Sequence, residues 1–476
     1  MVWYNNVLSF RGGTYTVSII TMEVNASRRL SLLSLLSVYV ILKVTVTASQ
    51  RYTIRGAVTS AESSTFMLPL ANVSLIGPLA NRCEPLSLLT SRLGTFEFSC
   101  TADPTENLSM VVWARQYEEQ ILRISSKLDF FNVALLPRHI PGFPGKLWRF
   151  DGWAVQAETG DVPGTNISFL SHPSAFRTPS GRVFMISTAG STTGQKPGWT
   201  QGYWQSKDGV QAVACKGPLI TESHPGVEGV SMSARLIYAD GRLLMVTGIE
   251  IPSQHRMVTI LENKNLDDPS HSEDWVGLGV IKVNFTGAPT SVHEDYRLHI
   301  LEGHQRYTCN GQPRKYWLLI IPDHVPGVPG RACGRMAFAS ESLTGPYTWC
   351  DWSVSPNNTA CDAFPGDLIP GLDSMYFAES YGSLYKGNMS GPLTFDMLPE
   401  KIVVPGPRGE WDDLGQVALT FLLPDQFSNR ARLYHASYST VSTNPNASKK
   451  DFGYKLAIGM YSFEWKSIGK KVEVNG

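Results

Sequence analysis

Ser180-Gly-Arg-Val-Phe-Met-Ile-Ser187 recurs sixty residues further along the chain as Asp240-Gly-Arg-Leu-Leu-Met-Val-Thr247. Each copy places a polar turn directly before a short apolar run, which is the pattern of a tight turn that leads into a buried strand. Self-similarity at a fixed spacing is the signature of a repeat architecture. The two copies therefore predict a chain built from repeated β units.

Further copies extend this repeat over the C-terminal two thirds of the chain. Asn310-Gly-Gln-Pro-Arg-Lys-Tyr-Trp-Leu-Leu-Ile-Ile321 again places a turn before a buried strand, and Ser342-Leu-Thr-Gly-Pro-Tyr-Thr-Trp349 is echoed by Asn388-Met-Ser-Gly-Pro-Leu-Thr-Phe395. Groups of four strands fit five units, at residues 171–221, 229–285, 297–352, 362–404 and 411–470. Five such units predict a five-bladed β-propeller over residues 166–476.

Composition agrees with an all-β chain of more than one domain. The 476 residues exceed what one ordinary core holds. Gly (42), Pro (30) and aromatic residues (11%) are plentiful, while charged residues make up only 17%, which suits short strands joined by tight turns. Lys plus Arg equals Asp plus Glu at 41 each, so the charge balance indicates neither a nucleic acid nor an anionic membrane as partner.

The N-terminus carries a targeting signal. Arg28-Arg29 is followed by an apolar stretch at residues 30–42 that is too short to span a bilayer comfortably. Val46-Thr47-Ala48 then fits the small-x-small pattern of a signal-peptidase site, so residues 1–49 are interpreted as a signal peptide and the mature chain is expected to begin at residue 49 or 50. Met22 offers an alternative start, and a signal anchor is the alternative to cleavage.

Seven Asn-x-Ser/Thr sequons follow this signal, and each one that is glycosylated must lie at the surface. They are Asn72, Asn107, Asn166, Asn284, Asn357, Asn388 and Asn446. Unmodified sequons that arise by chance are the alternative for some of them. Together they predict a secreted glycoprotein.

All seven cysteines also lie after the signal. Three close pairs are expected to crosslink hairpins or loops in an oxidising compartment, namely Cys83/Cys100, Cys309/Cys333 and Cys350/Cys361, with Cys215 left over. No pair has the Cys-x-x-Cys spacing of a zinc or redox site. The cysteines are therefore expected to be structural.

A small β-rich domain at residues 50–135 precedes the repeat. Its expected strands lie at residues 52–58, 73–76, 87–90, 94–99 and 110–115, as in a small β-sandwich. The order Arg55-Gly-x-Val, then Pro69-Leu-Ala-Asn-Val-Ser-Leu75, then Thr90-Ser-x-x-Gly-Thr-Phe-Glu-Phe98 resembles the transthyretin-like, carboxypeptidase-regulatory module. Residues 136–165, which begin with a Pro/Gly-rich run, are expected to be a linker.

Three motifs stand out in the repeat region: Leu301-Glu-Gly-His304, the run Ala337 to Trp349 that ends one unit, and Trp411-Asp-Asp-Leu-Gly-Gln416. They resemble the five-bladed propeller glycosidases of glycoside hydrolase family 43 and its relatives. The similarity covers roughly residues 165 to 470 and is built from short motifs. It implies the superfamily and its propeller, and it specifies no substrate.

The resemblance also implies a general acid. Cleavage of a glycosidic bond needs a protonated acid at the leaving oxygen and a second group that activates water or attacks the sugar. Glu302 matches the family's acid, because it lies at the beginning of the third unit in a Glu-Gly-x sequence and Tyr316 and Trp317 follow in the next strand. A salt bridge at the rim of the propeller is the structural alternative.

At the position of the general base, the sequence differs from that of the family. The family begins its first unit with Asp-Pro, whereas this chain has His172-Pro173. His172 is one candidate base, with a structural or substrate-binding role as the alternative. Asp413, which follows Asp412 before the fifth unit, is the second candidate, although Asp-Asp near a glycine is also ordinary turn chemistry.

Four residues are assigned to sugar binding. The second unit lacks the family's aspartate and offers Arg235 in its place, and His304 follows Glu302 closely. Trp411 precedes the fifth unit, and His435 resembles the family's histidine near the axis. A packed, hydrogen-bonded core residue is the alternative for His435.

Three functions remain open on this reading. The favoured one is a secreted glycoside hydrolase with a rearranged base. The others are a non-catalytic carbohydrate-binding protein and an adhesion protein that uses the propeller as a platform. Carbohydrate is the expected partner, with no membrane association of the mature form and no protein partner indicated. No cofactor is expected, and the resemblance leaves room for an ion in the central channel.

Overall fold

The structure, a computed structural model, describes the chain in segments. These are residues 2–10, 13–21, 51–101, 108–124, 130–156, 169–190, 200–209, 219–220, 224–225, 230–250, 257–287, 300–324, 332–354, 365–370, 375–379, 384–387, 395–398, 400–406, 412, 415–426, 429–439 and 453–465. Within these segments the chain is all-β, with 3-10 turns at Ala80–Arg82 and Ser272–Asp274. The expected all-β class is confirmed.

The N-terminal segment contains an antiparallel hairpin of β1 (Val2–Phe10) and β2 (Gly13–Thr21). The predicted signal segment at residues 30–42 and its cleavage site lie outside the described residues. In the part of the chain that the structure describes, no helix has the length and apolar character needed to cross a membrane.

Two sheets form the module at residues 51–135, which we call the N-terminal module. The first has the strand order β10-β9-β5-β7 and the second β11-β3-β8-β6, with β4 paired to β3. The strands are β3 (Tyr52–Ser60), β4 (Ser63–Met67), β5 (Asn72–Ile76), β6 (Cys83–Glu84), β7 (Ser87–Leu89), β8 (Thr95–Cys100), β9 (Ser109–Trp113), β10 (Gln120–Arg123) and β11 (Phe131–Leu135). The five strand positions expected from the sequence coincide with β3, β5, β7, β8 and β9.

Strict alternation explains why each sheet buries one face. In β8 the side chains of Phe96, Phe98 and Cys100 are buried and those between them are exposed, and β11 alternates in the same way. Successive side chains of a strand point to opposite faces, so this pattern buries one row of side chains. Val58 and Met110, one from each sheet, belong to the same fully buried apolar cluster.

The strands from residue 169 onward form antiparallel meanders. Their bounds are β13 (Phe169–Arg177), β14 (Val183–Gly190) and β15 (Thr200–Ser206); β16 (Val230–Ala239), β17 (Arg242–Glu250), β18 (Met257–Asn263) and β19 (Trp275–Val280); β21 (Ile300–Cys309), β22 (Gln312–His324), β23 (Ala332–Ser340) and β24 (Tyr347–Val354); β25 (Pro365–Pro370), β26 (Met375–Glu379), β27 (Leu384–Gly387) and β28 (Phe395–Met397); and β29 (Gly415–Leu422), β30 (Ala431–Ser439) and β31 (Gly453–Trp465). Short β20 (Val283–Asn284) pairs with β24, and a parallel bridge joins β24 to β28.

The expected linker at residues 136–165 contains a strand. β12 (Gly145–Gln156) pairs antiparallel with β31 and completes the sheet β12-β31-β30-β29. The Pro/Gly run ends at Gly145, and the buried Trp148 and Phe150 that follow supply the apolar side chains of a core strand. The beginning of the C-terminal region is therefore joined to its end.

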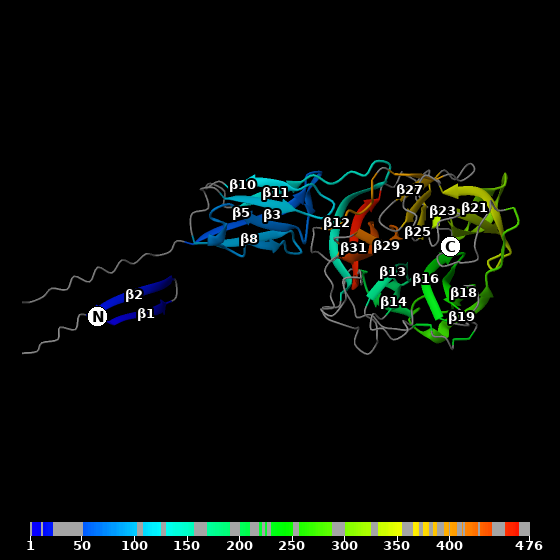
Figure 1. The fold of residues 1–476 in the computed structure, drawn as a ribbon, viewed down its shortest axis with the longest axis horizontal. Coiled ribbons are helices and arrows are strands. Elements are labelled where there is room, and N and C mark those ends of the chain that lie inside the picture. The colour runs from blue at the N-terminus through cyan, green and yellow to red at the C-terminus, as the bar shows by residue number, and fades with distance from the viewer. Residues whose placement is uncertain are drawn as a thin grey trace, which may run out of the picture.

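The first strands of the five meanders contact one another in a cycle. β13 contacts β16, β16 contacts β21, β21 contacts β25, β25 contacts β29, and β29 contacts β13. We call these five strands the ring. Figure 1 shows the meanders gathered in one C-terminal body, with the N-terminal module beside β12 and β31.

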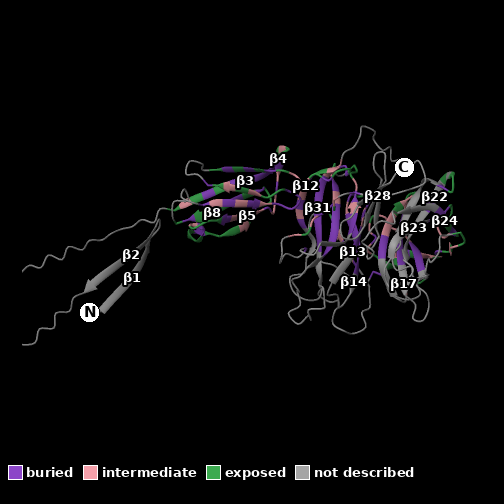
Figure 2. Ribbon diagram, turned by 45° about the horizontal axis from the view of Figure 1, so that its top comes forward, coloured by how far each residue is buried: buried purple, intermediate pink, exposed green. Residues whose placement is uncertain are grey.

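The N-terminal module packs tightly against this body, as the continuous burial in Figure 2 indicates. One apolar cluster runs from the module to Trp148 of β12 and Phe463 of β31, whose rings stack with centroids 4.2 Å apart. Tyr117 Oη donates a hydrogen bond to the carbonyl of Trp148 (2.7 Å), and Gln116 Nε2 donates one to the carbonyl of Ile402 (3.0 Å). We call this contact, between residues 115–117 and β12, β31 and residues 400–412, the junction.

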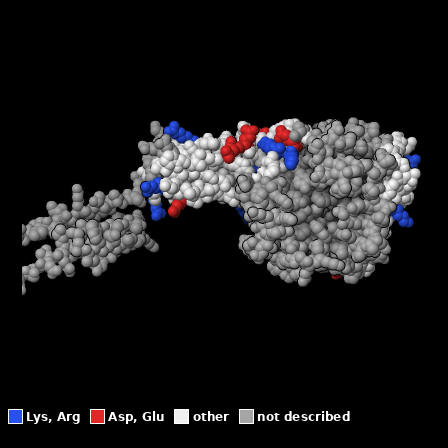
Figure 3. Space-filling model, viewed as in Figure 1, with Lys and Arg blue, Asp and Glu red and all other residues white. Residues whose placement is uncertain are grey.

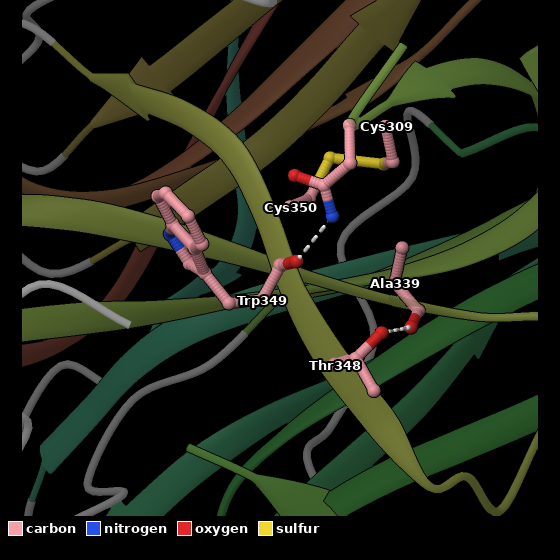
Figure 4. The surroundings of a disulfide bond; sticks show 6 residues. Cys309, Ala339, Thr348, Trp349 and Cys350 are labelled. Atoms are coloured by element: carbon pink, nitrogen blue, oxygen red, sulfur yellow. Dashed lines mark hydrogen bonds between the residues drawn. A yellow bond between two sulfur atoms is a disulfide. The ribbon is translucent and has the colours of Figure 1, made fainter. Parts of the chain in front are cut away.

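Two disulfides crosslink the described chain. The expected Cys83–Cys100 bond is confirmed. The expected pairings of Cys309 with Cys333 and of Cys350 with Cys361 are wrong, because Cys309 is bonded to Cys350. Figure 4 shows the bond between Cys309 and Cys350. The next residue in the chain, Asn310, donates from its amide to the carbonyl of Trp349 (2.9 Å).

Candidate functional site

The same irregularity interrupts all five strands of the ring. In each of them the register with the second strand shifts once, so that the first strand holds one extra residue, which is a β-bulge. The shifts lie between Ser171 and Ser174 in β13, Met232 and Arg235 in β16, Glu302 and Gln305 in β21, Pro365 and Leu368 in β25, and Gln416 and Ala418 in β29. Bulges redirect side chains and are over-represented next to active sites. The ring therefore carries five equivalent positions suited to a site.

His172 lies inside the first of these bulges. Its side chain is 5% exposed, and its backbone has φ +50°, in the left-handed region that a non-glycine residue seldom adopts. Burial, and in second place the nearby Arg235 cation, lower the pKa of His172 to about 3. The imidazole is therefore neutral at physiological pH.

Arg235 approaches His172 from the neighbouring strand of the ring. It is 6% exposed and is the first residue after the bulge of β16. The two strands are tied together there, because Leu236 N donates a hydrogen bond to Ser174 Oγ (2.9 Å). Thr188, which pairs with the residue before the β13 bulge, buries an Oγ1 that has no hydrogen-bond partner among the described residues. The described part of the ring thus combines burial with polar groups.

Three of the other candidates are placed less fully. Glu302 is the last residue before the bulge of β21, and His304 lies within that bulge. Their side chains are not among those described. Asp413 and Trp411 fall outside the described residues.

Asp412, expected as a replacement carboxylate, belongs to the junction. It is fully buried and forms an ion pair with Arg115 of the N-terminal module. Gly406 leaves room for this pair, because a Cβ at that position would lie 2.1 Å from Asp412 Oδ1 and 2.7 Å from Arg115 Nη1. The pair links two parts of the fold, and this position supports a structural role for Asp412.

His435 also lies near the junction. It belongs to the second strand of its sheet, β30, and not to the ring. The imidazole of His435 is fully buried and stacks on the side chain of Tyr461, with centroids 5.3 Å apart. Its Nδ1 lies 3.0 Å from Ser437 Oγ. Burial, followed by the Arg115 cation, lowers its pKa to about 3. These contacts favour the core alternative over sugar binding.

The sequence interpretation missed two features of this region. It did not identify Arg115 as the partner of Asp412, because the two are far apart in the chain and only the folded junction joins them. It also missed Asp367, which lies in the bulge of β25 at the register position of His304 in β21. A glycine before each residue, Gly303 and Gly366, was the available signal.

Two further kinds of site are relevant to the described residues, a metal site and a patch of like charge. In the described segments, no group of three or more His, Cys, Asp or Glu side chains is arranged to hold a metal ion. Figure 3 shows Lys and Arg side chains beside Asp and Glu side chains on the described surface of the N-terminal module, in agreement with the balanced net charge.

Comparison with known proteins gives remote likenesses. No protein-family model and no curated protein matches the chain. Among solved structures it is similar to a GH43_1 enzyme from Xanthomonas citri complexed with xylotriose, with 10% identity and a TM-score of 0.38 over 64% of this chain and 89% of that one. It is also similar to an α-L-arabinofuranosidase from Lactobacillus brevis, with 11% identity and a TM-score of 0.38 over 65% of this chain and 95% of that one. For the family 117 glycoside hydrolase Zg3597 from Zobellia galactanivorans, the identity is 11% and the TM-score 0.40, over 68% of this chain and 92% of that one. TM-scores this low carry no argument here.

Proposed function

We propose that the chain is a secreted glycoside hydrolase with its site at the ring of a five-bladed β-propeller. The observation that carries the proposal is the bulge that recurs in all five strands of a closed cycle of contacts. In propellers the sheets surround a central channel, and ligand sites use the loops and strand ends around it. The pairing of β12 with β31 supports the closed arrangement, since it joins the first and last strands of the region. The N-terminal module is proposed to be a β-sandwich, supported by its two one-sided sheets.

Glu302 is the proposed general acid. Its place directly before the bulge of β21 agrees with the glycosidase-like Leu301-Glu-Gly-His304 motif. A protonated carboxyl there would transfer its proton to the glycosidic oxygen as the bond to the sugar breaks. His304, two residues later in the bulge, is proposed to contact the same sugar.

His172 and Arg235 fit substrate positioning better than proton transfer. An imidazole with a pKa of about 3 takes a proton from water only weakly, which makes His172 a poor general base near neutral pH. The Arg235 guanidinium carries several N–H donors in a rigid plane, which suits the hydroxyl oxygens of a sugar. We assign both to binding, together with Trp411.

Secretion is proposed from the signal-like segment, the sequons and the disulfides. Asn284 supports it structurally, because this sequon residue is exposed at the end of β20, where Thr286 N donates to Asn284 Oδ1 (3.0 Å). Mature protein purified from medium is expected to begin at residue 49 or 50 and to lose mass on treatment with an N-glycosidase. An unshifted band, or retention of the protein in the cytosol, would contradict this assignment.

A carbohydrate-binding protein without activity is the second candidate. One observation favours it: the first strand carries His172, a poor base, where the resembled family has its aspartate. Such a protein would keep the sugar site and lack turnover.

One experiment separates the two candidates. The full chain is incubated with a panel of plant, algal and animal glycans, and products are measured by chromatography while binding is measured by calorimetry. The hydrolase predicts turnover that Glu302→Gln lowers by about a hundredfold or more with binding retained. Binding without turnover would support the second candidate, and neither binding nor turnover would reject both.

A further inference from the structure

The fourth meander places an acidic residue in the ring. In β25 the bulge consists of Gly366 and Asp367. In β21 it consists of Gly303 and His304, directly after Glu302. The two strands thus share a glycine at the first bulge position, which suits the unusual backbone of a bulge, and carry an ionisable residue at the second.

β21 and β25 are neighbours in the ring, which brings this aspartate close to the proposed acid. Some Cα atoms of the two strands approach within 8 Å of one another. In inverting glycosidases the two carboxyl groups are separated by roughly 6.5–9.5 Å, which leaves room for a water molecule.

We infer that Asp367 is the general base of this site, an assignment that rests on the glycoside hydrolase function proposed above. The Asp367 carboxylate accepts a proton from water, whose oxygen forms the new bond to the anomeric carbon. The glycosidic carbon–oxygen bond breaks, and its oxygen takes the proton of Glu302. One proton is gained at Asp367 and one is lost at Glu302, so the step balances and the anomeric configuration inverts.

The other candidate bases are less suitable. Asp412 is held in its ion pair with Arg115 at the junction. His172 has a pKa of about 3. Asp413 precedes β29 and lies ahead of the bulge of that strand, whereas Asp367 lies within a bulge.

The test compares two aspartates of the same sheet in the full chain. Asp367→Asn removes the carboxylate in the ring, and Asp396→Asn removes one on the outer strand β28 as a matched control. On a glycan that the parent cleaves, we expect Asp367→Asn to lower kcat by about a hundredfold or more and to remove the acidic limb of the pH profile of kcat/KM. The control should keep both.

Chemical rescue makes the test independent of folding. Formate added to Asp367→Ala should restore turnover, and azide should yield a glycosyl azide of inverted configuration, because a small external anion enters the space of the lost carboxylate. Full turnover by Asp367→Asn would overturn the inference while the hydrolase function stands. So would the absence of rescue in an Asp367→Ala variant that melts like the parent. A parent without turnover on any glycan would overturn the proposed hydrolase and the base together.

Discussion

The junction and the ring both bury polar residues, but they do so differently. At the junction, Asp412 faces the Arg115 cation inside an apolar cluster that spans two parts of the fold. In the ring, His172 lies within the bulge of β13 and Arg235 directly follows the bulge of β16. A charge pair enclosed in a continuous core indicates a structural role, because loss of either partner leaves an uncompensated buried charge. Repeated bulges with polar residues indicate a site. Burial alone therefore does not separate structural from functional residues, and the partners do.

The largest expected effect is at the junction. Asp412→Asn leaves the buried Arg115 cation without its counter-charge, and removing one partner of a buried pair costs about 3–5 kcal/mol. Glu400→Gln is the matched control, because its pair with Arg138 is partly exposed (42% at Glu400) and is worth about 1 kcal/mol or less. Urea unfolding measures both. Equal losses of stability would show that the Arg115–Asp412 pair does not stabilise the junction.

The second largest effect concerns the Cys309–Cys350 disulfide, which links β21 of the ring to the outer strand β24. The double variant Cys309→Ser/Cys350→Ser should lower stability by about 2–4 kcal/mol, because the disulfide closes a chain segment of 41 residues in the unfolded state. Removing Cys83–Cys100, with 17 residues, should cost about 0.8 kcal/mol less in the same chain-entropy estimate. Peptide mapping under non-reducing conditions checks the connectivity. A Cys309–Cys333 peptide would contradict it.

The two buried histidines predict a pH dependence, one from each region. Their folded-state pKa values of about 3 lie below the ordinary 6.5, so unfolding takes up protons between these values. Stability is therefore complete above pH 6.5 and falls as the pH falls below it, by about 1.4 kcal/mol per pH unit for each histidine. His172→Gln and His435→Gln should each lower the slope of stability against pH by the amount that corresponds to one proton taken up on unfolding. Curves with unchanged slopes would mean that these histidines have the same pKa in the folded state as in the unfolded state.

The fold could be predicted further than the site, for physical reasons. The apolar runs at residues 183–187 and 243–247 have the pattern of buried strands, and the structure places β14 and β17 there. The strand at Gly145–Gln156 was missed because the preceding Pro/Gly run concealed it, and its pairing with β31 is a contact between residues far apart in the chain. The bulges and the Arg115–Asp412 pair likewise depend on register and long-range contact, which a local pattern does not contain.

Proton donation by Glu302 within the ring should make the rate depend on the leaving group in a characteristic way. Aryl glycosides of one sugar are compared, with phenols that range from strongly acidic to weakly acidic. Glu302→Gln should cleave those with the most acidic phenols almost as fast as the parent, because these leaving groups need no proton, and should lose about a hundredfold or more on the least acidic ones. A uniform loss across the series, or no loss at all, would contradict the assignment of Glu302 as the acid.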